Sequence, residues 1–395
     1  MRPALLVLCA AAVACGGSIL PAIPEPPAAD PCATITCAAH AGCQGGACVC
    51  DPGYTGPASA CVASAAPALG GCSLFPADHV FNTPIDAFPV HAGSAAFLAR
   101  IGNHPLHLDL GQIEDMASSG YYGIPYNVVR SGTVGWSAVA FGNPGWDPRA
   151  ESDCAVASGG GHAVVSPCTA AAAPTPLFPL PAAPLVEGGL PASEATGGDH
   201  HLLVVDADAC RLWELYHFYR STGGWGSWGA ASWDLSSNAL RTDGWTSSDA
   251  AGFPVLPLLL RADEASSGEI RHALRFTLPS TRSSHVWPAR HHAGSGTAPD
   301  LAPMGQLFRL KSSFVIPATY SAQSKAILRA LQRYGMYLAD NGSALYVQGE
   351  PSAAWSDAIW SEVQTVRTAD LEAVDLSSIA GRTGFDAGSA RVPPP

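Results

Sequence analysis

Residues 284–292, SHVWPARHH, gather side chains that can transfer protons, bind anions and stack on rings. The chemistry-bearing side chains are His285, Trp287, Arg290, His291 and His292. Pro288 interrupts any regular helix or strand, so these residues are expected on a loop or at a strand end, where function often lies. Arg290 could bind a carboxylate through two hydrogen bonds, and His291 could transfer a proton. We therefore predict that this segment forms one wall of a polar cleft rather than a packed loop.

The spacing of these histidines does not favour a metal site. His285 and His291 are six residues apart, and His291 and His292 are neighbours. Neither spacing is the His-x-His or His-x-x-x-His pattern that lets two imidazoles share one ion. A divalent metal would need His200 or His201 from elsewhere in the chain. The sequence requires no cofactor, and a divalent metal is the one cofactor that it leaves possible.

The pair His200 and His201 follows Asp199 after two glycines, at the start of a predicted strand. Adjacent residues of a regular strand point to opposite faces, so only one of the two histidines could serve a given site. His200 is the candidate that we keep. The alternative is that both lie in solvent at the start of the strand.

Glu214 lies among aromatic residues in the segment WELYHFY. In a strand it shares a face with Leu212, Tyr216 and Phe218. Burial among such residues disfavours the charged form of a carboxyl group and is typical of a general acid. The same pattern is also typical of a carboxylate that is paired with a buried arginine, for which Arg275 is the candidate.

Two further segments could add ionisable groups to a cleft. His272 falls on the apolar face of an alternating stretch with Phe276, where a histidine is more often a core residue than a catalyst, whereas Arg275 falls on the opposite face. Asp340 opens Asp-Asn-Gly-Ser (340–343), which is first of all a turn signal. Its carboxylate could nevertheless line the cleft.

Tryptophans are concentrated in one glycine-rich region. The four residues are Trp225, Trp228, Trp233 and Trp245, out of ten tryptophans in the chain. Glycine-rich flanks could leave ring faces open to bind sugars, or the rings could form the core of a loop-rich region. As candidate substrate-binding residues we take Trp225, Trp228, Trp233 and Trp287.

Charge and motifs exclude several function classes. The formal net charge is −12, only 13% of residues are charged, and no basic run occurs. Nucleic-acid binding is therefore not expected. The chain has no Gly-x-Ser-x-Gly, His-Glu-x-x-His, phosphate-binding glycine loop or dinucleotide fingerprint, which disfavours common serine hydrolases, zinc proteases and nucleotide enzymes.

The elements that must position these residues are mainly strands. Alternation and turn signals predict a hairpin over 201–205 and 210–219, and further strands over 270–277, 307–314 and 343–349. One helix is predicted from an N-cap at Ser321 to Gly335. Residues 158–184 are predicted as a long surface excursion. With no βαβ alternation and no internal repeat, the prediction is a mainly β fold, a sandwich or jelly-roll-like domain with one or two helices.

The N-terminus predicts export. One arginine precedes an apolar run from Ala4 to Ala14, which is too short to span a membrane and has the length of a signal-peptide core. The small residues before Cys15 resemble a bacterial lipoprotein cleavage box at the end of the predicted signal segment (1–15), which implies cleavage before Cys15 and lipidation of Cys15 as the new N-terminus. Ordinary signal cleavage is the alternative. Either way the protein is expected outside the cytoplasm, and with the lipid it would be anchored to a membrane.

A cysteine-rich module (32–62) follows a proline- and alanine-rich linker (16–31). Its cysteines are Cys32, Cys37, Cys43, Cys48, Cys50 and Cys61. The Cys-Val-Cys pair and the following Asp-Pro-Gly-Tyr-Thr-Gly resemble an EGF-like module. The resemblance implies the pairs Cys32–Cys43, Cys37–Cys48 and Cys50–Cys61, and a segment this short needs such links to fold. Four outlying cysteines, Cys72, Cys154, Cys168 and Cys210, complete an even set of ten; Cys154–Cys168 could tie the surface excursion, and the pairing stays open.

Beyond a second linker (63–70) lies the main domain (71–379), followed by a predicted flexible tail (380–395). Several strings of the main domain, including GDHHLLVVDADACRLWELY, HVWPARHHA and PMGQLFRLKSSFVI, resemble a group of exported bacterial proteins. The resemblance implies one coherent exported domain and carries no activity.

Together these features predict an exported carbohydrate-active enzyme with a polysaccharide or surface glycan as partner. In a hydrolase, Glu214 would work with a second carboxylate, Asp340 or Asp199. In a lyase, the proton would be abstracted by His291 or His272, and Arg290 or Arg275 would neutralise the uronate carboxylate. The alternative is a non-catalytic surface protein that binds glycan or protein. An enzyme requires that His200, Glu214, Arg275 and His291 converge.

Overall fold

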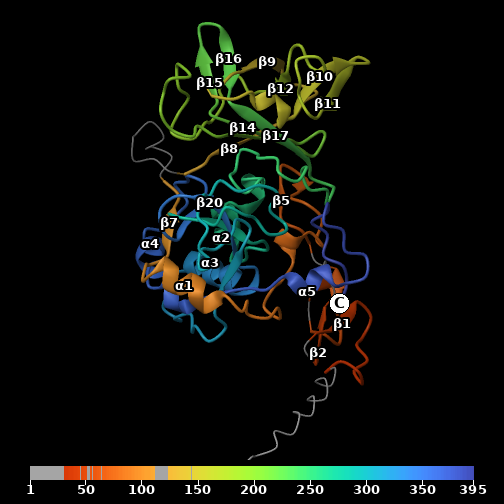
Figure 1. Ribbon diagram of the computed structural model, residues 1–395, viewed down its shortest axis with the longest axis vertical. Helices are drawn as coiled ribbons and strands as arrows, with labels where there is room; N and C mark the ends of the chain where they lie inside the picture. Colours follow the sequence, from red (N-terminus) through yellow and green to blue (C-terminus); the bar gives the residue numbers. More distant parts are fainter. Residues whose placement is uncertain are drawn as a thin grey trace, which may run out of the picture.

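The computed structural model describes residues 31–44, 46–50, 54–55, 57–63, 65–111, 123–143 and 145–395. The predicted signal peptide, the lipidation site Cys15 and nearly all of the first linker lie outside the described residues, as do residues 51–53 and 56 of the EGF-like motif. The chain is 28% strand and 14% helix, which confirms the mainly β prediction. Strands form three larger sheets stacked along the long axis of the molecule (Figure 1).

The N-terminal segment is a small disulfide-linked unit. Strand β1 (Ala41–Gln44) pairs with β2 (Ala47–Cys50), and β3 (Tyr54–Thr55) pairs with β4 (Val62–Ala63), both antiparallel. Its disulfides are Cys32–Cys43, Cys37–Cys48 and Cys50–Cys61, which confirms all three expected pairs. The unit lies beside the C-terminus of the chain (Figure 1).

The upper sheet of Figure 1 has six strands in the order β11-β10-β12-β9-β16-β15. Their bounds are Trp136–Phe141 (β9), Cys154–Ser158 (β10), Gly161–Val165 (β11), Leu177–Pro179 (β12), Tyr219–Ser221 (β15) and Gly224–Ser227 (β16). The prediction that 158–184 is a surface excursion is therefore wrong, because β11 and β12 both belong to this sheet. The disulfide Cys154–Cys168 links β10 to the segment between them.

The middle sheet has the order β17-β14-β13-β8 and confirms the predicted hairpin. Its strands are Tyr126–Val129 (β8), Leu202–Asp206 (β13), Arg211–Tyr216 (β14) and Gly229–Asp234 (β17). Both faces of the β13–β14 hairpin in this sheet are buried. Leu202 and Val204 pack into the core beneath the upper sheet, whereas Leu203 and Val205 pack into the main core on the other side. Such double burial explains why this hairpin is almost continuously apolar.

The lower sheet has the order β22-β19-β20-β18-β21-β7, and β18 and β20 run parallel at its centre. The strands are His107–Asp109 (β7), Leu274–Leu278 (β18), Leu307–Leu310 (β19), Met336–Asn341 (β20), Tyr346–Gln348 (β21) and Leu371–Ala373 (β22). The strands predicted over 270–277 and 307–314 are shorter than expected. Every residue of β18 is buried, Arg275 included, which fits the expectation of a buried arginine at this position.

Helices are more numerous than the one or two predicted. The α-helices in the described residues are Ser94–Ile101 (α1), Ala262–Ser267 (α2), Ala322–Arg333 (α3), Ala358–Val363 (α4) and Ser377–Ala380 (α5). Short 3₁₀ turns span Val80–Asn82 (η1), Pro148–Ala150 (η3), Leu256–Leu258 (η4) and Thr368–Asp370 (η5). Only α3 was predicted, and its Ser321 cap is confirmed. The others have one to two turns, too short for a clear periodic pattern.

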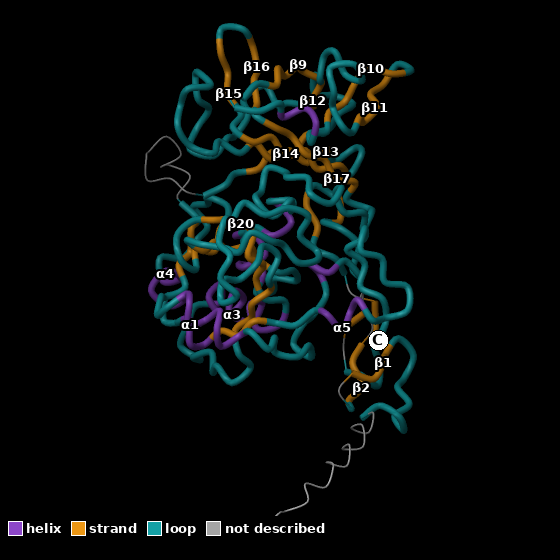
Figure 2. The backbone as a smooth tube through the Cα atoms, in the orientation of Figure 1, coloured by secondary structure: helices purple, strands orange, loops and turns teal. Residues whose placement is uncertain are grey.

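Helices gather around the lower sheet, whereas the upper two sheets are joined largely by loops (Figure 2). None of the helices in the described part of the chain has the length and apolar composition of a membrane span. The predicted linker and tail are both ordered in part. Strand β5 (Ala68–Leu69) pairs with β6 (Cys72–Ser73), and Ala390 and Val392 are buried in the main core. Residues 380–395 are therefore not a free tail along their whole length.

The disulfide Cys72–Cys210 joins the start of the main domain to the β13–β14 turn across 138 residues, whereas Cys154–Cys168 spans only 14. We expect removal of both sulfurs by Cys72→Ala with Cys210→Ala to cost about 4–5 kcal/mol of unfolding free energy, because a longer closed loop restricts the unfolded chain more. The double variant at 154 and 168 should cost about 3 kcal/mol. Urea unfolding measures both, and equal or reversed losses would contradict this ranking.

Candidate functional site

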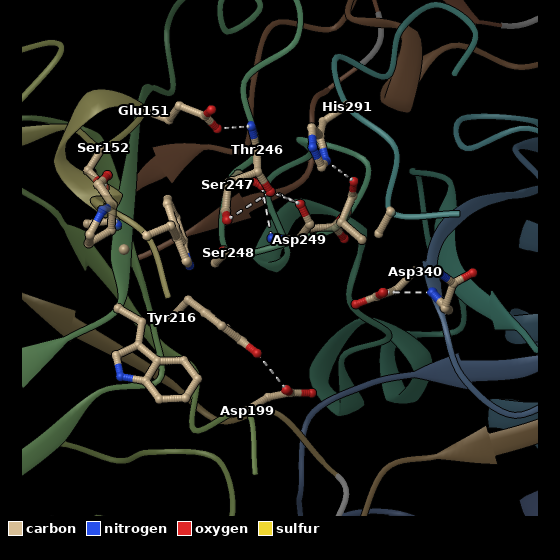
Figure 3. Close-up of a pocket in the computed structure, with 18 residues that line it drawn as sticks. Glu151, Ser152, Asp199, Tyr216, Thr246, Ser247, Ser248, Asp249, His291 and Asp340 are labelled. Carbon is tan, nitrogen blue, oxygen red and sulfur yellow. Dashed lines mark hydrogen bonds between the residues drawn. The ribbon is translucent and has the colours of Figure 1, made fainter. Parts of the chain in front are cut away.

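A polar hollow of about 330 Å³ lies between the middle sheet and the carboxyl end of β20. We call it the central cavity. It is lined by the segment 146–152, the end of β14, the start of β17, the turn 246–250, His291 and Asp340. Figure 3 shows side chains from these separate segments around one opening. The segment 284–292 and the hairpin region 199–219 therefore meet there, through His291 on one side and Asp199 with Tyr216 on the other.

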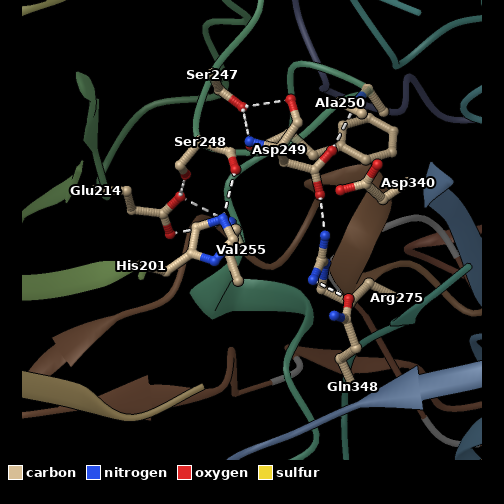
Figure 4. A network of polar contacts seen from close by, with 12 residues as sticks. His201, Glu214, Ser247, Ser248, Asp249, Ala250, Val255, Arg275, Asp340 and Gln348 are labelled. Atoms are coloured by element: carbon tan, nitrogen blue, oxygen red, sulfur yellow. Dashed lines mark hydrogen bonds and ion pairs between the residues drawn. The ribbon is translucent and has the colours of Figure 1, made fainter. Parts of the chain in front are cut away.

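A buried guanidinium lies behind one wall of this cavity. Arg275 on β18 is 1% exposed, and its Nη2 donates to Oδ2 of Asp249 at 2.6 Å. A second nitrogen of Arg275 donates to the side-chain oxygen of Gln348 on β21. Asp249 is itself almost fully buried, and its other oxygen accepts from the Ala251 N–H at 2.7 Å. Figure 4 shows this chain of contacts, with the Asp340 carboxyl next to it.

Of the carboxyl groups of Asp249 and Asp340 in this wall, that of Asp340 is the one that a ligand in the cavity can reach. It is partly exposed, lines the cavity and accepts from the Asn341 N–H at 2.6 Å. Burial raises the pKa of Asp340 to about 7, and the Asp249 charge adds to the rise while Arg275 and the Asn341 N–H oppose it. Arg275 keeps its proton at any ordinary pH and is paired directly with Asp249. We therefore place the proton that the two carboxyl groups share on Asp340.

Asp199 supplies a carboxylate on the neighbouring side of the cavity. It is exposed, and its Oδ1 accepts from the Tyr216 hydroxyl at 3.1 Å (Figure 3). Its backbone is held by the His217 N–H, which donates to the Asp199 carbonyl oxygen at 2.8 Å. The charge of Asp199 also raises the pKa of Asp340. The cavity thus presents one carboxyl group with a raised pKa and one that is exposed, and acid and base catalysis uses two carboxyl groups in such different environments.

His291 reaches the cavity from the segment that first suggested a site. Its Nδ1 lies 2.8 Å from the Ala250 carbonyl oxygen, which can only accept, so Nδ1 carries a proton. Nε2 is then the nitrogen that is free to accept or carry a second proton. The backbone N–H of His291 also donates to Ala251, so the histidine and the 246–250 turn are fixed to each other.

Aromatic rings and hydroxyls complete the lining. Trp146 is 44% exposed, and Tyr216 and Trp228 line the cavity further in. Glu151 accepts from the Thr246 N–H at 3.0 Å and places a further acidic group at the cavity wall. Among the described lining residues there is no lysine or arginine. The cavity is therefore acidic, with apolar ring surfaces available to a ligand.

Glu214 is not a catalytic acid, which corrects the sequence prediction. It is fully buried, and it accepts from Ser248 Oγ at 2.7 Å and from the Val255 and Leu256 N–H groups at 2.9 Å. It does not bond to Arg275, the partner that we had proposed. Figure 4 shows that Glu214 instead supports the turn that carries Asp249. Its role is to position the wall of the cavity.

The two histidines before β13 are also structural and buried, so the alternative of a solvated strand start is wrong. His200 lies between the carbonyl oxygens of Glu187 and Gly197, at 3.0 and 2.9 Å. His201 contacts Glu187 Oε2 at 2.5 Å and the Ser248 carbonyl at 2.7 Å. Although burial opposes its charge, the Glu187 carboxylate raises the pKa of His201 to about 9. Neither side chain lines the central cavity.

His272 and Arg290 have structural partners as well. His272 is fully buried, with Nε2 2.9 Å from Glu264 and Nδ1 2.8 Å from the Ala273 carbonyl. Arg290 donates to the carbonyl oxygens of Arg241 and Ala387, at 2.8 and 3.0 Å. Neither lines the central cavity, so neither can serve as the base or the carboxylate clamp of a lyase there. Of the set His200, Glu214, Arg275 and His291, only His291 faces the cavity, so the predicted convergence is wrong and any catalysis there depends on other groups.

The tryptophans do not form one platform. Trp225 stacks on Phe218 in the upper sheet, with the Arg220 guanidinium 4.3 Å from its ring centre. Trp233 is 5% exposed and belongs to the main core. Trp287 donates its indole N–H to the Ser389 carbonyl and lines a different hollow. Trp228 alone among the four candidates reaches the central cavity.

The described residues contain no set of metal ligands, because no three His, Cys, Asp or Glu side chains among them are arranged to hold an ion.

Asp249, Glu151 and Tyr216 are site residues that sequence reasoning missed. Residues 248–252, which include Asp249, form bends and a turn. No local pattern marks these positions, because their role depends on Arg275, Thr246 and Asp199, which come from other segments.

The role of Glu214 can be tested by substitution. Glu214→Met removes the acceptor of two backbone N–H groups and one hydroxyl, so we expect a loss of about 3 kcal/mol or more in unfolding free energy. Glu214→Gln keeps one carbonyl oxygen for the two N–H groups and should lose less. Urea unfolding measures both. A Gln variant with wild-type stability and no activity on a substrate would contradict a supporting role.

The chain was compared with known proteins in three ways. No family model matches it, no curated protein is found to be similar, and no solved structure is found to be similar. The resemblance of residues 32–61 to an EGF-like module, and that of residues 71–379 to a group of exported bacterial proteins, stay predictions from the sequence.

Proposed function

We propose that this protein is an exported polysaccharide hydrolase whose reaction takes place in the central cavity. The observation that carries the proposal is the state of its two accessible carboxyl groups. Burial and the neighbouring Asp249 charge raise the pKa of Asp340 to about 7, and Asp199 is an exposed carboxyl group that lines the same cavity. A protonated and an ionised carboxyl group in one hollow form the minimal machinery for hydrolysis of a glycosidic bond.

The proposed step is a simple displacement. Asp340 donates its proton to the glycosidic oxygen while the bond from the anomeric carbon to that oxygen breaks. Water attacks the anomeric carbon, and Asp199 accepts the proton that the water loses. The net change is addition of one water across the bond, after which a proton passes from Asp199 to Asp340 through solvent. Tyr216 keeps the Asp199 carboxylate in place through its hydroxyl.

The lining favours sugars over other ligands that carry a hydrolysable bond. Trp146, Tyr216 and Trp228 offer ring faces for the C–H groups of a sugar, while Ser247 and the carboxylates offer partners for its hydroxyls. Cavities that hold small ligands have this mixture of apolar walls and a few polar groups.

The charge of the cavity narrows the class of polysaccharide. Glu151, Asp199 and Asp249 join Asp340 in the lining, and the described lining residues supply no cationic side chain except a protonated His291. Such a site repels a uronate, whose carboxylate a lyase must neutralise. We therefore favour hydrolysis of a neutral or amino-sugar polymer over the lyase reaction.

Export is supported by the disulfides. Five link the described residues, and disulfides persist in oxidising compartments outside the cytoplasm. A lipid anchor at Cys15 and a spacer role for the EGF-like unit belong to the same proposal. The anchor would hold the main domain near a membrane surface that carries or meets glycans.

The full chain should release reducing ends from at least one member of a panel that includes xylan, β-glucan, chitosan and polygalacturonate. Asp340→Asn and Asp199→Asn should each lower kcat by about 10²-fold or more, because each removes one proton-transfer group. The matched control is Asp300→Asn, which changes a surface carboxylate 3.8 Å from Arg100 and should leave activity unchanged. Binding without hydrolysis by the wild type would favour a glycan-binding protein instead.

The pH dependence of this activity follows from Asp340. Its pKa is raised to about 7, and its protonated form is the active one, so kcat should fall as pH rises through about 7. Arg275→Gln removes the cation that stabilises the charged form of Asp249 beside Asp340. The variant should therefore shift the pH at which kcat falls. A rate that rises through the same range would contradict the assignment of Asp340 as the acid.

A further inference from the structure

A second hollow adjoins the central cavity. It has a volume of about 850 Å³ and is lined by residues 193–199, Tyr216, His217, Tyr219, Ser221 and Trp228. Three of these residues also line the central cavity. The shared residues are Asp199, Tyr216 and Trp228. We call it the outer hollow. Because the proposed base and two aromatic rings line both hollows, a ligand can contact this wall while extending into either one.

We propose that the outer hollow binds the continuation of the same glycan chain, so that the protein cleaves polymers that extend beyond the central cavity. This inference rests on the proposed function and adds the substrate form to it. The central cavity is at the lower end of the size range of ligand sites, and the outer hollow is near the upper end. The two together suit a chain of several sugars better than a single small ligand.

The floor of the outer hollow is held in a fixed shape. His217, which is 1% exposed, lies 2.9 Å from the carbonyl oxygens of both Gly198 and Glu194. His200 holds the same loop through the Gly197 carbonyl. Sugars bind most tightly to sites that need no ordering, because ordering a loop costs free energy on binding.

The chemistry of the outer hollow also fits a sugar chain. The Trp228 ring stacks on the His217 ring at 3.8 Å between centres, which fixes the orientation of the tryptophan. The Glu194 carboxylate lies 3.4 Å from the Tyr219 hydroxyl, and Ser193 and Thr196 add further hydroxyls. The described lining contains no lysine or arginine. This hollow therefore has the same preference for uncharged or cationic sugars as the central cavity.

Gly197 offers a way to block the outer hollow without disturbing the fold. A side chain built at Gly197 meets no atom within 4 Å, and its φ is not in the positive range that disfavours other residues. Gly197→Trp should therefore fill part of the hollow while the protein still folds. Gly135→Trp is the matched control, because Gly135 has the same open space and lies outside both hollows.

The experiment uses the full chain and the polysaccharide that the wild type hydrolyses, with short and long oligosaccharides prepared from it. Gly197→Trp should lower kcat/KM on the long oligosaccharides and the polymer by about tenfold or more. The kcat/KM on the shortest oligosaccharide that the wild type cleaves should not change. Gly135→Trp should change neither. Thermal unfolding confirms that both variants fold.

Two negative results have different meanings. An active wild type whose Gly197→Trp variant keeps its rate on long chains, or loses rate equally on short and long ones, would overturn the role of the outer hollow alone. A wild type that hydrolyses no member of the panel would overturn the proposed function. If the wild type is active, the binding of long and short oligosaccharides to the Asp340→Asn protein can be measured by calorimetry. Adding Gly197→Trp to this protein should weaken the binding of the long oligosaccharides and leave the binding of the short ones unchanged.

Discussion

The arrangement of the site depends on one buried cation that lies close to two carboxyl groups. Arg275 is enclosed by β18, β21 and the 246–250 turn, and it pairs directly with Asp249. A charged group that is removed from water needs a close partner of opposite charge to offset the cost of losing its hydration. Asp249 supplies that partner, which leaves the neighbouring Asp340 without a direct one. Burial and the Asp249 charge therefore raise the pKa of Asp340 to about 7, which makes it the carboxyl group of the cavity wall that can donate a proton.

Much of the surrounding structure supports the turn that carries Asp249. Glu214 accepts hydrogen bonds from three groups between residues 248 and 256, and His201 binds the Ser248 carbonyl from the same strand pair. Glu151 binds the Thr246 N–H from the upper side. Each of these contacts crosses from one sheet or loop to another. The middle sheet is thus both the shared layer of two cores and the support of the site.

The sequence predicted the elements whose evidence is local. The 201–219 hairpin, the helix that begins after Ser321 and the three N-terminal disulfide pairs are all present. In β18 both faces are buried, so its alternation separates two buried faces, and Arg275 has an internal carboxylate partner, Asp249. Short helices and the strands β11 and β12 were missed, because too few residues carry their pattern.

The sequence by itself determined the ten cysteines between Cys32 and Cys210, the acidic balance of the chain and the chemistry available at each position. It also indicated that 284–292 and 199–219 could share a site, and His291 does meet Asp199 and Tyr216 at one cavity. Only the tertiary structure decided which groups face that cavity. Glu214, His272 and Arg275 have the residue types of a catalyst, yet each is enclosed by partners from distant segments. Burial and pairing are properties of the packed chain, and no spacing along the sequence specifies them.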